Sequence, residues 1–180
     1  MKKGVDIEKT HRAERLDLYL VRHAVAYERD AERWPDDAKR PLTPEGEERF
    51  RRATRGILRL VPEVGAVLSS PFVRAWRTAE ILEQVGWPAP VPCEELEPDY
   101  PPHNILDVLA RYAEVESVAL VGHRPQLHEL TSYLLTGNAD DARVQIKKGG
   151  AVCLSFDDLP EPRAGYLEWL LTPEVLRTIG

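Results

Sequence analysis

Cysteine is scarce in this chain of 180 residues, which holds only Cys93 and Cys153. Two cysteines without metal-like spacing exclude a disulfide framework, so we expect buried, reduced thiols and a cytoplasmic protein. No run approaches the roughly 20 apolar residues of a membrane-spanning helix, so no membrane partner is expected. Basic residues are not in excess either: 24 Lys and Arg stand against 30 Asp and Glu, a net charge of −6. That balance disfavours a general nucleic-acid-binding protein, although the local field of a cleft can still attract an anion.

The length favours a single domain, which we expect to span 16–180. Residues 1–15 are predicted to be a polar leader, because they are charged throughout and lack the apolar core of a secretory signal. No internal repeat or low-complexity segment interrupts the rest.

Strand-like and helix-like patterns alternate along the first two thirds of the chain. Apolar runs predict strands at 16–21, 64–68, 117–121, 144–146, 151–156 and 166–171, with short edge strands near 91 and 96. Helical spacing and cap signals predict helices at 44–60, 71–85, 104–113 and 125–135, and a short one from 173. Such alternation is typical of an α/β fold with parallel pairing, and the β-rich end predicts at least one antiparallel edge strand.

Two histidines and two arginines follow the ends of three predicted strands. Arg22 and His23 end the first strand, His123 follows the strand at 117–121, and Arg74 comes shortly after the strand at 64–68. In open α/β sheets, chemistry gathers beyond the carboxyl ends of the strands. Histidine as a nucleophile and arginines as clamps for phosphate oxygens suit a phosphoryl group. An isolated histidine would more often be structural, but here the neighbouring arginine and the second histidine favour a catalytic site.

Three motifs in this order resemble those of the histidine phosphatase superfamily. They are Arg22-His23-Ala24, Ser70-Pro71-x-x-Arg74-Ala75-x-x-Thr78-Ala79 and Gly122-His123-x-Pro125. Within it, the chain is most similar to the small SixA-type phosphohistidine phosphatases, through Arg40-Pro41-Leu42-Thr43-x-x-Gly46, Lys147-Lys148-Gly149-Gly150-Ala151-Val152 and Trp169-Leu170-Leu171-Thr172-Pro173. The resemblance covers about 16–178 and implies a three-layer α/β/α sandwich like that of phosphoglycerate mutase.

The resemblance also implies a mechanism. His23 would attack phosphorus and form a phosphohistidine, which water then hydrolyses, while Arg22, Arg74 and His123 hold the phosphoryl oxygens. No metal or other cofactor is expected, because arginines and histidines occupy the roles a metal would fill. Arg40 is a possible contact at the rim of the cleft. Tyr27 and Trp34, in the long loop after His23, either cover the cleft or pack on the core.

The general acid is the least defined part of the site. Larger members of the superfamily carry a carboxylate two residues past a leucine, whereas here Leu96 is followed by Glu97 and then Pro98. Glu97 and Asp99 are the candidates, with the loop residue Asp37 as a further possibility. The nitrogen leaving group of a phosphoramidate departs readily once it is protonated. The absence of a carboxylate at the expected position therefore favours a phosphohistidine substrate.

The predicted partner is therefore a phosphorylated protein or a small phosphate ester. The segment between the second helix and Gly122 is short, which predicts an uncapped, open cleft and favours protein phosphohistidine. A phosphatase of small metabolites is the first alternative. A catalytically weak module that binds phosphoproteins is the second, and the intact set of four site residues argues against it.

Overall fold

The computed structural model describes residues 15–180, so the predicted leader at 1–15 lies outside the described residues except for Arg15. A six-stranded sheet in the order β3-β2-β4-β1-β5-β6 forms its centre. The strands are β1 (Leu16–Arg22), β2 (Ala66–Ser69), β3 (Val91–Pro92), β4 (Ser117–Gly122), β5 (Ala151–Phe156) and β6 (Tyr166–Leu171). The helices are α1 (Pro44–Leu60), α2 (Val73–Gln84), α3 (Asn104–Leu109), α4 (Gln126–Thr136) and α5 (Pro173–Ile179). Short 3-10 turns lie at Asp37–Lys39, Glu94–Leu96 and Ala110–Tyr112.

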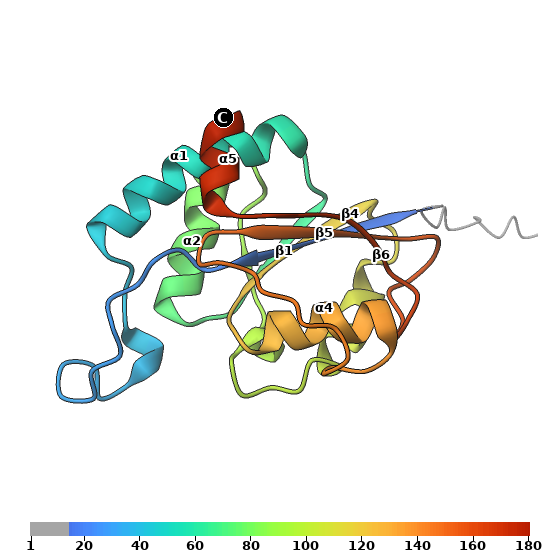
Figure 1. Ribbon diagram of the computed structural model, residues 1–180, viewed down its shortest axis with the longest axis horizontal. Helices are drawn as coiled ribbons and strands as arrows, with labels where there is room; N and C mark the ends of the chain where they lie inside the picture. Colours follow the sequence, from blue (N-terminus) through green and yellow to red (C-terminus); the bar gives the residue numbers. More distant parts are fainter. Residues whose placement is uncertain (1–14) are drawn as a thin grey trace, which may run out of the picture.

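Helices cover both faces of the sheet, with α1, α2 and α5 on one side and α4 on the other (Figure 1). The first four strands in the sheet order pair in parallel, while β5 pairs antiparallel with both β1 and β6. This arrangement confirms the predicted α/β/α sandwich, mostly parallel with an antiparallel edge. None of the helices among the described residues is long and apolar enough to cross a membrane.

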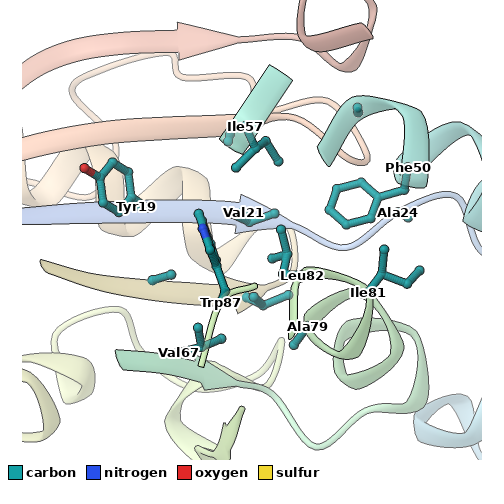
Figure 2. Packing of buried hydrophobic residues seen from close by; sticks show 14 of the residues in the cluster. Tyr19, Val21, Ala24, Phe50, Ile57, Val67, Ala79, Ile81, Leu82 and Trp87 are labelled. Atoms are coloured by element: carbon teal, nitrogen blue, oxygen red, sulfur yellow. The ribbon is translucent and has the colours of Figure 1, made fainter. Parts of the chain in front are cut away.

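Alternate residues along the strands pack into two separate hydrophobic cores, one on each face of the sheet. On β1, Tyr19 and Val21 pack with α1 and α2 residues, whereas Leu18 and Leu20 pack toward α3 and α4. Figure 2 shows the core that contains Tyr19 and Val21, with Phe50 of α1 beside Ala24. Each fully buried aliphatic or aromatic side chain contributes about 1.5–3 kcal/mol. The predicted thiols lie in these cores, since Cys93 and Cys153 are free and buried.

Several elements differ from the prediction. No edge strand forms near 96, because the Leu96 N–H donates to the Cys93 carbonyl in the 3-10 turn at Glu94–Leu96. Strand β2 begins at Ala66 rather than at 64, and α3 ends at Leu109 rather than at 113.

No strand forms at 144–146, because the backbone of Ile146 bonds to side chains: its carbonyl accepts from Arg22 and its N–H donates to His128. Helix α2 begins at Val73 rather than at 71, with Phe72 at its N-cap position. The Ser70 hydroxyl accepts from the N–H of Phe72 in the turn before the helix and also contacts His123.

Candidate active site

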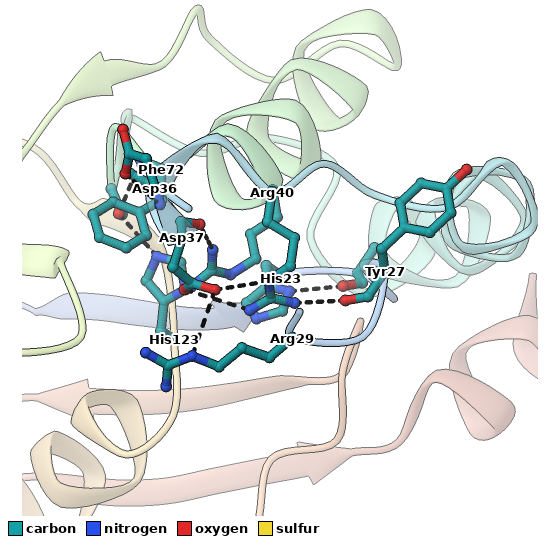
Figure 3. Close-up of polar contacts among 12 residues, drawn as sticks. His23, Tyr27, Arg29, Asp36, Asp37, Arg40, Phe72 and His123 are labelled. Atoms are coloured by element: carbon teal, nitrogen blue, oxygen red, sulfur yellow. Dashed lines mark hydrogen bonds and ion pairs between the residues drawn. The ribbon is translucent and has the colours of Figure 1, made fainter. Parts of the chain in front are cut away.

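The strand register brings the two histidine motifs together. Arg22 on β1 pairs with Gly122 on β4, so His23 and His123 leave adjacent strands at the same level. The His23 N–H donates to the Gly122 carbonyl at 3.0 Å, and the two imidazole centroids lie 5.1 Å apart. Strand β2 flanks β4 on its other side and ends one residue before Ser70. The predicted meeting of three strand ends is therefore present (Figure 3).

His23 is buried and held in one tautomer. Its Nδ1 lies 2.7 Å from the carbonyl oxygen of Ala24, and because a carbonyl can only accept, Nδ1 carries the hydrogen. Nε2 then has a free lone pair. Burial, together with the positive charges of Arg74 and Arg22, lowers the pKa of His23 to about 3. The ring is therefore neutral at physiological pH, as a nucleophile must be.

Thr78 couples His23 to helix α2. Its hydroxyl accepts from the Ala24 N–H at 3.0 Å and donates to the Arg74 carbonyl at 2.7 Å. The residue that fixes the His23 tautomer is thus tied to the turn of α2 that carries Arg74. This contact explains why Arg74 and Thr78, one helical turn apart, occur together in the motif.

His123 is also buried, and its pKa is lowered by burial and then by the neighbouring His23. Its Nε2 lies 2.9 Å from the Ser70 hydroxyl. Because that oxygen already accepts from the Phe72 N–H, its own hydrogen is available to Nε2. In this arrangement His123 Nδ1 carries a hydrogen. Nδ1 is buried and has no hydrogen-bond partner within residues 15–180, so it can donate to a ligand.

Arg74 is buried beside the histidines and is held by Asp37. One terminal nitrogen donates to the Asp37 carbonyl at 2.8 Å and the other to the Asp37 carboxylate at 3.0 Å. The same carboxylate accepts from Arg40 Nε at 2.8 Å, and Arg29 Nε lies 3.9 Å away (Figure 3). The hydrogen bond from Arg40 and the charges of all three arginines lower the pKa of Asp37. Asp37 is therefore a carboxylate near neutral pH and is poorly suited to act as the general acid.

Arg22 is held by the backbone of Ile146. One terminal nitrogen donates to the Ile146 carbonyl at 2.9 Å, and burial lowers the pKa of the guanidinium. The Nε atoms of Arg22 and Arg74 are both buried without a partner in the described part of the chain. Unpaired buried donors are costly, so a ligand with several acceptor oxygens would stabilise this arrangement.

All four predicted catalytic residues line one hollow of 520 Å³. With Arg22 and Arg74 included, six cationic side chains line it: Arg22, Arg29, Arg40, Arg74, Arg124 and Lys148. Four acidic side chains accompany them: Glu28, Asp36, Asp37 and Asp99. The hollow is therefore locally positive in a protein of net charge −6, which favours an anionic ligand.

The other residues predicted to belong to the site differ in whether they line the hollow. Asp99 lines the hollow, whereas Glu97 does not. Arg40 lines it, as expected of a rim contact. Tyr27 and Trp34 are absent from the lining and pack on each other, with ring centroids 5.9 Å apart. The two rings therefore pack within the loop, which is neither of the two expected arrangements, covering the cleft or packing on the core.

Two contributors were missed in the sequence. Ser70 looked like a helix cap, but its hydroxyl contacts His123. Lys148 lines the hollow although it lies far along the chain. The signal for Lys148 was its place before Gly149, whose N–H donates to the carbonyls of Arg22 and His23 at 3.0 and 3.1 Å.

Comparisons with known proteins identify the family of the chain. The sequence profile described as histidine phosphatase superfamily (branch 1) matches residues 18–97. An uncharacterized protein of Picosynechococcus sp. is 32% identical over 143 residues, covering 77% of this chain and 84% of the relative.

Solved structures extend the likeness. A structure of the protein histidine phosphatase SixA complexed with tungstate has a TM-score of 0.76 and 25% identity, covering 89% of this chain and 99% of its own. The α-ribazole phosphatase of Shigella flexneri shares the fold, with a TM-score of 0.67, 17% identity and coverage of 88% and 97%. The chain belongs to the histidine phosphatase superfamily, in its SixA-type branch.

Proposed function

We propose that this phosphatase removes phosphoryl groups from phosphohistidine on proteins, through a phosphohistidine intermediate on His23. The observation that carries the mechanism is the hydrogen bond from His23 Nδ1 to the Ala24 carbonyl, at 2.7 Å. It leaves Nε2 unprotonated beside the cationic groups of the hollow. A neutral imidazole with a fixed tautomer needs no separate base before it attacks.

The reaction has two steps. In the first, the His23 Nε2 lone pair forms a bond to phosphorus while the bond from phosphorus to the leaving group breaks. Arg22 and Arg74 stabilise the charge that spreads over the equatorial oxygens, and His123 Nδ1 donates a hydrogen bond to one of them. In the second step, water attacks phosphorus, inorganic phosphate leaves, and His23 recovers its lone pair. Because these side chains supply the positive charge, we propose that no metal ion takes part.

Leaving-group chemistry and the structural relatives support a phosphohistidine substrate. The imidazole of phosphohistidine departs as a neutral ring once its distal nitrogen is protonated, so a strong general acid is not needed. The SixA structure with tungstate is named a protein histidine phosphatase, and tungstate is an oxyanion like phosphate. The hollow is built from surface loops and strand ends and is not covered by Tyr27 or Trp34.

A small phosphate ester is the second candidate, and Asp99 is the observation that favours it. Asp99 lines the hollow, and its carboxyl would protonate an alkoxide leaving group. The fold is shared with an α-ribazole phosphatase, which acts on a metabolite.

Single-turnover phosphate release tests both candidates. A phosphohistidine-bearing carrier protein and an aryl phosphate are each mixed with excess enzyme, as wild type, His23→Ala and His103→Ala, with and without EDTA. His103 is exposed and lies outside the hollow, so it is the matched control. Rapid release from the carrier protein, lost only in His23→Ala and unaffected by EDTA, is expected. Release from the aryl phosphate alone would favour small esters, and activity in His23→Ala would exclude the mechanism.

A further inference from the structure

A second hollow, of 330 Å³, lies next to the phosphoryl site and shares Lys148 with it. Residues from four segments form it: the chain after His23, helix α1, the turn at 147–149 and helix α5. Apolar groups line one part, namely Ala24, Val25, Phe50 and Pro173. Cationic groups line the other, namely Arg49, Lys147, Lys148 and Arg177. We call this the basic hollow.

Its positive charge is nearly uncompensated. Glu174 is the one acidic residue in the lining, and it pairs with Arg177 at 3.6 Å. Within residues 15–180, Arg49, Lys147 and Lys148 have no carboxylate within 4.0 Å. Elsewhere on the same helix α1, Arg51 and Arg52 pair with Glu47 and Glu48. Arg49, Lys147 and Lys148 therefore line the basic hollow with positive charge that an acidic ligand can pair with.

The basic hollow is held rigidly against the nucleophile. Gly149 donates to the carbonyls of both Arg22 and His23, and Gly150 accepts from the Arg22 N–H at 3.1 Å. Gly149 has a φ of +78°, and a Cβ there would lie 3.3 Å from the Phe50 ring. The turn that presents Lys147 and Lys148 is therefore fixed relative to His23. A ligand whose phosphoryl group sits at His23 can reach the basic hollow past Lys148, which lines both hollows.

We propose that the basic hollow docks an acidic segment of the phosphorylated protein, with one apolar side chain flanked by carboxylates. This inference rests on the proposed function and narrows its substrate class. Carboxylates would pair with Arg49, Lys147 and Lys148, and the apolar side chain would cover Phe50 and Pro173. A small bisphosphorylated metabolite would satisfy the cations but leave the apolar part of the lining exposed to water. The combination of the two linings therefore favours a polypeptide.

Synthetic phosphohistidine peptides test this directly. One series carries Glu-Leu-Glu at increasing distances on either side of the phosphohistidine, and the matched series carries Gln-Leu-Gln. The enzymes are wild type, the pair Arg49→Glu with Lys147→Glu, and the control pair Arg55→Glu with Arg111→Glu. The control makes the same change in charge at exposed residues outside both hollows. A sugar bisphosphate and its monophosphate complete the set.

Wild type is expected to prefer the best-spaced Glu-Leu-Glu peptide by about tenfold or more in kcat/KM, falling with added salt. The Arg49/Lys147 variant should lose this preference and keep its rate on the Gln-Leu-Gln peptides, while the control pair keeps both. Equal losses on both peptide series, or an unchanged preference, would overturn the docking site alone. Discrimination confined to the bisphosphate would also overturn it. Failure of wild type on every phosphohistidine peptide, with turnover of the small esters, would instead overturn the proposed function and this inference with it.

Discussion

Replacing Asp37 by asparagine tests whether this carboxylate positions Arg74. Asp37 accepts from Arg74 at 3.0 Å and from Arg40 at 2.8 Å. The Arg74 side chain is only 4% exposed, so water can do little to solvate its guanidinium once the Asp37 carboxylate is neutralised. Asparagine keeps the shape and one acceptor oxygen but removes the negative charge. Hydrogen bonds to charged groups contribute about 1.5–3 kcal/mol, and a neutral acceptor retains part of this.

We expect Asp37→Asn to lower the free energy of unfolding by about 1–2 kcal/mol. For a domain of this size the melting temperature would fall by about 2–8 °C. The pKa of Asp37 is lowered in the folded protein, so its contribution is present above its ordinary value of 3.8 and is lost as the pH falls through the lowered pKa. The difference in stability between wild type and variant should therefore vanish in acid. Activity should fall about tenfold through kcat, because a misplaced Arg74 stabilises the transition state less.

Calorimetry across pH and steady-state kinetics on one phosphohistidine substrate measure these effects. Asp36→Asn is the control, because Asp36 lies next in the chain and also lines the hollow, but its carboxylate accepts from the Ala38 N–H and pairs with exposed Lys39 rather than with an arginine. Positioning by Asp37 requires a loss of kcat in its variant, with KM nearly constant, and little change in the control. A rise in kcat/KM would refute the reasoning, since it would mean that Asp37 competes with the phosphoryl group for Arg74. Equal effects of the two variants would refute it as well.

Two further predictions concern the histidines and the acid. Because burial lowers the pKa of both His23 and His123, their imidazole NMR signals should stay constant between about pH 5 and 8; a titration of either ring near pH 6.5 would contradict the assigned neutral state. Asp99→Asn should slow hydrolysis of an alkyl phosphate by about 100-fold, as expected for loss of a general acid, and should slow phosphohistidine hydrolysis by less than about threefold. Glu97→Gln should change neither rate, and the opposite ranking would assign the acid to Glu97.

The sheet and the convergence of its motifs follow from local sequence patterns. Each of β1, β2 and β4 is a short apolar run bounded by polar or turn residues, so both its existence and its carboxyl end could be predicted. Parallel neighbours then place Arg22, Ser70 and His123 at one edge without further information. The strand predicted at 144–146 does not form, because the backbone of Ile146 bonds to the side chains of Arg22 and His128 instead of to a neighbouring strand. The pattern of apolar residues does not show whether a segment's backbone bonds to side chains or to a neighbouring strand.

Contacts that local sequence patterns do not show distinguish the three candidate acids. Glu97 and Asp99 are two residues apart and chemically alike, so no local pattern ranks them. A turn closed by the Tyr100 N–H and the Glu97 carbonyl, at 3.2 Å, redirects the chain between them. Pro98 and Asp99 then line the hollow and Glu97 does not. The carboxylate of Asp37, a third candidate acid by sequence, accepts hydrogen bonds from Arg40 and from Arg74, which lies 37 residues away. Those contacts lower its pKa and change its proposed role from proton donor to anchor. A carboxylate's role in this site therefore depends on which arginines surround it, and the fold alone supplies that.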